Sequence, residues 1–160
     1  MQKRKKPSVK ENKYKHPLRR VFYCLEKIMR HPQWTTRLPE TLKNAINRPF
    51  AWGEHDCCLF ASDCVIAVCD FDPCESIRGR YKTKTGAFRV LQKEFLTLEC
   101  AVSRFFDEVP TNEAGRGDIV MFEGDEGKTL GILWAGKLWA ISTDGVRAVS
   151  NKPIKAWRVQ

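Results

Sequence analysis

The residues of this sequence best suited to chemistry are an acid and a cysteine that stand side by side in AWGEHDCCLFASDCV, residues 51–65. Asp56 is of a residue type that caps helix N-termini, and apolar side chains follow it at helical spacing. Cys57 would then lie in the first turn of that helix. The partial positive charge at a helix N-terminus favours a thiolate. Cys57 is therefore a candidate nucleophile.

Two other interpretations of Cys57 stay open at this point. Cysteine is among the most buried residue types and packs as a small apolar side chain, which is the simplest role for Cys64 in the same helix. A structural zinc site usually has paired ligands two to four residues apart. None of the seven cysteines forms a Cys-x-x-Cys pair, so we predict no metal site and no cofactor.

A cysteine nucleophile usually needs a base, most often a histidine, and a third group that orients the base. The chain has three histidines, His16, His31 and His55, and all of them precede Cys57. His55 is expected just outside the helix and pointing away from the thiol. His31 could reach the thiol only in a rearranged pair.

Apolar spacing predicts four helices before Gly115. The first covers residues 18–30 and ends at His31-Pro32, because a residue before proline avoids the α region. The second begins near Pro39, which suits a first helical turn, and ends before Pro49. The apolar positions of these two helices are Leu18, Val21, Phe22, Leu25, Ile28 and Met29 in the first, and Leu42, Ala45 and Ile46 in the second.

The third predicted helix opens at Cys57 and has the most regular apolar face. The fourth lies within YKTKTGAFRVLQKEF, residues 81–95, with Thr85 as its N-cap. The inward positions are Cys57, Phe60, Ala61, Cys64, Val65 and Val68 in the third helix, and Ala87, Val90, Leu91 and Phe95 in the fourth.

After Gly115 the pattern changes to short runs rich in Val, Ile and Trp, which predict strands. WAGKLW reads as a tight hairpin. The runs are DIVMF, TLGILWA, KLWAIS, GVRAV and KAWRV. Helices followed by strands predict an α+β fold, in which the N-terminal helices, including the Cys57 helix, pack on a small C-terminal antiparallel sheet.

Taken in order, FAWGEHDCCLF, RGRYKTKTGAFRVL, RGDIVMF, LGILWAGKLWAI and KAWRV resemble the NlpC-type cell-wall peptidases of the papain-like superfamily. They are more similar still to a compact phage and prophage family with that core, which is found among tail genes. The resemblance covers roughly residues 33–160. It implies a papain-like, NlpC-like fold in a single α+β domain of residues 18–160.

The NlpC type opens its nucleophile helix with Asp-Cys-Ser-Gly, and Asp56-Cys57 matches the first half of this motif. A Gly-Asp before a strand matches Gly117-Asp118. The next strand of the NlpC type has its catalytic histidine in a His-Val-Gly-Ile pattern. Here Thr129 occupies the histidine position, and threonine cannot act as a base near neutral pH. The orienting residue would lie near Ala140–Ile141, where neither side chain can hydrogen-bond, so the usual triad is absent.

A basic arm precedes the predicted domain. Residues 1–20 carry nine Lys/Arg and one acid, Glu11, which accounts for most of the net charge of +9. We expect residues 1–17 to be flexible and to attract polyanions or an acidic neighbour in an assembly. Weak, non-specific nucleic-acid contact and a purely solvated arm are the alternatives. The candidate contact residues are Lys3, Arg4, Lys5, Lys6, Lys10, Lys13 and Lys15.

The resemblance and the missing histidine together predict a structural or assembly protein of a phage or prophage tail, not an enzyme, with other tail or virion proteins as partners. The alternative is an active cysteine peptidase or amidase that cleaves peptidoglycan stem peptides with Cys57. The sequence has no apolar core of a signal peptide and no membrane-spanning run. We therefore expect the protein in the host cytoplasm during assembly and in the virion tail afterwards.

Overall fold

The structure is a computed structural model that describes residues 28–160. The basic arm, its lysines and Arg4, and His16 lie outside these residues. Of the helix predicted over residues 18–30, only residues 28–30 are described, and these are not helical. The His31 N–H donates to the Val68 carbonyl at 2.7 Å, which attaches this segment to the end of the Cys57 helix.

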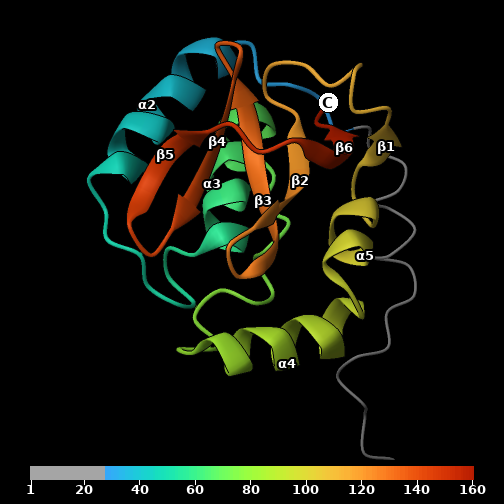
Figure 1. Cartoon of the computed structure of the whole chain (residues 1–160). Coiled ribbons are helices and arrows are strands. Elements are labelled where there is room, and N and C mark those ends of the chain that lie inside the picture. The colour runs from blue at the N-terminus through green and yellow to red at the C-terminus, as the bar shows by residue number, and fades with distance from the viewer. Residues whose placement is uncertain (1–27) are drawn as a thin grey trace, which may run out of the picture.

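In residues 28–160, four helices precede the sheet, and Figure 1 shows their arrangement. Their bounds are α2 Trp34–Ile46, α3 Cys57–Cys69, α4 Lys84–Phe95 and α5 Leu98–Ser103. The prediction of α3 is confirmed, including its N-cap Asp56. The six-residue helix α5 was not predicted, because it is too short for a periodic apolar pattern.

The predicted start of α2 near Pro39 is wrong. The helix begins at Trp34 because Trp34, Leu38, Leu42 and Ala45 form one apolar face in the core. Burial of this face outweighs the backbone hydrogen bond that Pro39 cannot donate. Ile46, predicted to face inward, is 48% exposed, since it lies one helical step beyond that face.

Two predictions for α4 are also wrong. Its N-cap is Thr83, whose hydroxyl accepts from the Gly86 N–H, and not Thr85. Phe95 is the buried residue of α4, whereas the other three inward predictions, Ala87, Val90 and Leu91, are only half-buried. The apolar face of α4 borders an open cavity and not a closed core.

Six antiparallel strands form one sheet with the order β1-β6-β2-β3-β4-β5. All five predicted strands are present, and only the three-residue β1 was missed. The α+β fold is therefore confirmed. The strands are β1 Asp107–Val109, β2 Ile119–Gly124, β3 Gly127–Trp134, β4 Lys137–Ser142, β5 Gly145–Val149 and β6 Pro153–Arg158.

The hairpin between β3 and β4 is confirmed. Trp134 pairs with Lys137, which leaves Ala135 and Gly136 as the two turn residues. Their φ angles are 51° and 73°, the left-handed values of a type I′ turn.

The main core lies between the helices and one face of the sheet (Figure 1). Helix α3 crosses behind β3 and β4, and its side chains Phe60, Val65 and Val68 are fully buried with Trp157 of β6. No helix in the described part of the chain has the length and apolar character that a bilayer span requires.

Asp118 is the buried acid that joins the two ends of the described chain. Its carboxylate accepts hydrogen bonds from Arg30 at 2.8 Å, from the Val159 N–H at 3.1 Å and from the Gly115 N–H at 2.9 Å. The Arg158 Nε lies 3.1 Å from its second oxygen. The Gly-Asp of the sequence motif therefore has a structural role here.

Candidate functional site

A cavity of about 680 Å³ opens at the N-terminus of α3, between α4 and the strands β2 to β5. This volume lies within the range of small-molecule sites. Cys57 and Cys58 line it from α3, Thr129 from β3 and Ile141 from β4, and the exposed Phe88 of α4 forms part of the opposite wall. The structure thus brings Cys57 and Thr129 to one cavity.

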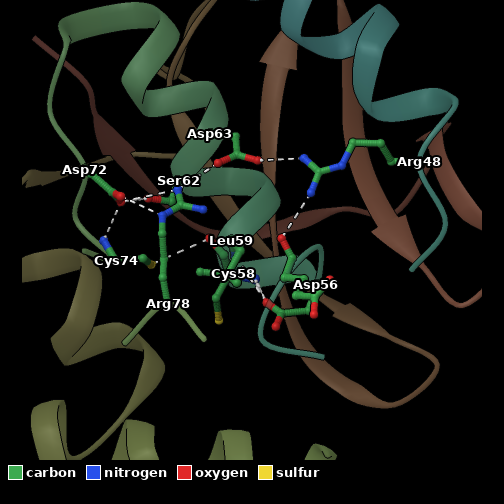
Figure 2. A network of polar contacts seen from close by, with 10 residues as sticks. Arg48, Asp56, Cys58, Leu59, Ser62, Asp63, Asp72, Cys74 and Arg78 are labelled. Atoms are coloured by element: carbon green, nitrogen blue, oxygen red, sulfur yellow. Dashed lines mark hydrogen bonds and ion pairs between the residues drawn. The ribbon is translucent and has the colours of Figure 1, made fainter. Parts of the chain in front are cut away.

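Asp56 caps α3 and is 1% exposed. One carboxylate oxygen accepts from the Cys58 and Leu59 N–H groups, each at 3.1 Å. The other accepts from the Gly53 N–H and the Tyr81 hydroxyl, each at 2.8 Å. Figure 2 shows the first pair. Because its acceptor positions are filled, Asp56 positions the helix start and is not a free base.

The Trp-Gly turn before α3 requires its glycine. Gly53 has φ 77°, and a Cβ at this position would lie 1.9 Å from the Tyr81 carbonyl oxygen. This close approach also brings the Tyr81 hydroxyl to Asp56. Burial, and after it the Asp56 charge, raise the pKa of Tyr81, so the hydroxyl stays protonated and donates.

The Cys57 thiol is half-buried and has a lowered pKa. The main cause is a hydrogen bond with the Cys58 thiol, and the backbone N–H of Leu130 on β3 acts in the same direction. Burial and the Asp56 charge oppose this shift. The sequence expectation rested on the helix N-terminus, whereas the main cause here is the neighbouring thiol.

The positions where the NlpC type has its base and orienting residue hold no ionisable group. The Thr129 hydroxyl donates to the Gly127 carbonyl at 3.1 Å. Ala140 and Ile141 line the same cavity with apolar side chains. All three positions therefore lie on the cavity that Cys57 also lines.

Neither described histidine reaches the cavity. His55 is 1% exposed, and its Nδ1 lies 3.1 Å from the Pro49 carbonyl oxygen. His31 lies near the other end of α3, 3.9 Å from Asp70. Over residues 28–160, no imidazole or carboxylate hydrogen-bonds the Cys57 sulfur.

Sequence reasoning missed the polar network that supports the cysteine pair (Figure 2). Arg78 binds Asp72 at 2.6 Å and Asp63 of α3 at 2.7 Å. Asp72 also accepts from Ser62 at 2.5 Å and from the Cys74 N–H at 2.9 Å. The network joins the segment after α3 to the face beside Cys58. The signal available was the RGRY motif, which contains Arg78 and Tyr81.

Among the residues that the structure describes, Asp56, Cys57 and Cys58 form a group that could hold a metal ion, with one ligand atom from each, all within 4.8 Å of one another. The zinc rule applied to the sequence considers ligand pairs two to four residues apart, so it did not count these adjacent cysteines as a pair.

A family model described as a domain of unknown function, DUF6950, matches residues 29–159. The chain belongs to this family. The DUF6950 match spans both walls of the cavity and the Asp118 contacts, and so covers nearly all of the described domain. A search of curated proteins finds no match.

Proposed function

We propose that this DUF6950 chain is a tail-associated structural or assembly protein of a phage or prophage, with a papain-like, NlpC-like fold that lacks a catalytic base. It would act in the host cytoplasm during assembly and remain in the tail. The observation that carries the proposal is that Thr129 lines the same cavity as Cys57 and stands where a histidine would be required.

The arrangement of α3 and β3 supports the NlpC-like part of this proposal. In that type a cysteine at a helix start faces a strand that supplies the base, and here the Leu130 N–H of β3 contacts the Cys57 sulfur. The residue before Leu130 is Thr129, whose hydroxyl cannot accept a thiol proton near neutral pH.

The cavity itself supports a binding role. Its wall includes Phe88 and Leu96, which are 58% and 75% exposed. Exposing such large apolar side chains to water does not stabilise a free monomer, and exposed apolar surface of this kind marks binding sites. Neighbouring tail proteins are the proposed partners. The basic arm, outside the described residues, remains a predicted second contact.

The test is complementation of a phage that lacks this gene. We expect the deletion to abolish tail formation, seen by electron microscopy, and Cys57→Ala to restore tails and infectivity. Phe88→Asp, which places a charge on the exposed cavity wall, should restore neither. Normal tails in the deletion would overturn the proposal.

The lowered pKa of Cys57 favours a second candidate, a cysteine peptidase or amidase that acts on peptidoglycan stem peptides. Incubation of the purified protein with cell wall would then release free amines or shorter stem peptides. Release that Cys57→Ser abolishes and Cys100→Ser leaves unchanged would establish this activity. The absence of release at high protein concentration would exclude it.

A further inference from the structure

Cys57 and Cys58 place two sulfur atoms together on the wall of the cavity. Both residues are half-buried and line the cavity. Their sulfurs lie within 4.8 Å of one another. Two sulfurs at tetrahedral positions on one zinc-sized ion are about 3.8 Å apart, given bonds of about 2.3 Å, and the 4.8 Å limit on this pair allows that separation.

The two adjacent thiols cannot readily form a disulfide with each other. Consecutive Cα atoms across a trans peptide are about 3.8 Å apart, whereas disulfides usually need at least about 4.4 Å. The first turn of α3 fixes this backbone, because Asp56 accepts from the Cys58 N–H and from the Leu59 N–H. The sulfurs therefore stay available to a ligand from the cavity.

Asp56 does not complete the site, although its carboxylate belongs to the same group. Its oxygens already accept from three backbone N–H groups and from Tyr81. The protein thus offers two sulfurs and leaves the remaining coordination positions toward the cavity. Thiolates with no oxygen ligand select soft cations over Mg²⁺ or Ca²⁺.

We propose that Cys57 and Cys58 together bind one thiophilic metal cation of the Zn²⁺ class, with its other coordination positions open to the cavity. The site is independent of the proposed tail function and needs no catalytic base. Binding replaces the proton of each thiol, and the two released protons go to solvent.

Cd²⁺ is a suitable probe, since cadmium thiolates absorb in the ultraviolet. The full-length reduced protein should show this absorption with saturation at one Cd²⁺ per chain, and Zn²⁺ should displace it. Cys57→Ser and Cys58→Ser should each weaken binding at least about tenfold. The control Cys100→Ser, which changes an exposed thiol outside the cavity, should bind like the wild type. Unchanged binding in the two serine variants would overturn the proposal.

A second measurement uses the unmodified protein and so does not depend on the folding of any variant. Site-resolved mass spectrometry after alkylation should show that Cd²⁺ protects both Cys57 and Cys58, while Cys100 is still labelled. Equal labelling of Cys57 and Cys58 with and without Cd²⁺ would also overturn the site.

Discussion

Cys57 differs from Cys69 and Cys74 in the groups that surround its sulfur. A thiol partner and a backbone N–H lower its pKa. Burial instead raises the pKa of Cys69 to about 11 and that of Cys74 to about 12. The thiol pKa is therefore lowered at Cys57 and raised at Cys69 and Cys74, although all three residues lie close together in the chain.

This difference predicts the order in which the thiols react. A thiolate attacks iodoacetamide and a thiol does not, so Cys57 should be labelled at lower pH than Cys69 and Cys74. The measurement is the alkylation rate at each site in the native protein, between about pH 5 and 9. If Cys57 reacts no faster than Cys69 throughout this range, its pKa is not lowered.

The contact between Tyr81 and Asp56 could not be predicted from the sequence, because the two residues lie 25 positions apart. Tyr81→Phe removes a hydroxyl that donates to a buried carboxylate and should lower the free energy of unfolding by about 1.5–3 kcal/mol. Urea denaturation measures this change. Thr143→Val, on the exposed rim of the cavity, is the control and should change stability by less than about 0.5 kcal/mol.

At the scale of elements, the β3–β4 hairpin shows how a turn can be improved. Ala135 has φ 51°, a left-handed value that disfavours residues with a Cβ, whereas Asn tolerates it. Ala135→Asn should raise the free energy of unfolding by about 0.5–1 kcal/mol, and the β-branched Ala135→Val should lower it. Thermal and urea denaturation of both variants test this; an equal effect of the two would contradict the turn assignment.

The elements that the sequence predicted well have strong local signals. Helix α3 has an unbroken apolar face and an acidic N-cap, and β3 to β5 are separated by short turns. Elements α5 and β1 are short and acquire their form from contacts distant in the chain, such as the pairing of Asp107 with Arg158. Such contacts leave no periodic pattern.

The site was predictable to the same degree. Asp56, Cys57 and the position of Thr129 followed from motifs, because each lies at the start or within a regular element. The contact between Cys57 and Cys58, the half-buried face of α4 and the Tyr81 contact depend on how elements pack. The spacing rule for zinc ligands concerns pairs two to four residues apart, and on that rule the sequence analysis set aside a metal site at the adjacent cysteines.

At the scale of the whole molecule, Asp118 connects the segment before α2 to the last strand. Asp118→Asn leaves Arg30 and Arg158 without their buried counter-charge and should lower the free energy of unfolding by about 3–5 kcal/mol. Guanidinium denaturation followed by tryptophan fluorescence gives the value. Asp144→Asn breaks an exposed pair with Arg147 and should change it by less than about 1 kcal/mol.

The strand order has a consequence for biosynthesis. Strand β6 contains the last paired residues of the chain, yet it lies inside the sheet, between β1 and β2. While a ribosome still holds residues 153–158, strand β2 of the emerging polypeptide has an open edge. Residues Ile119 to Phe122 are then not yet paired with β6. The sheet can close only after translation has passed these residues, and until then an unpaired apolar edge is open to association with other chains.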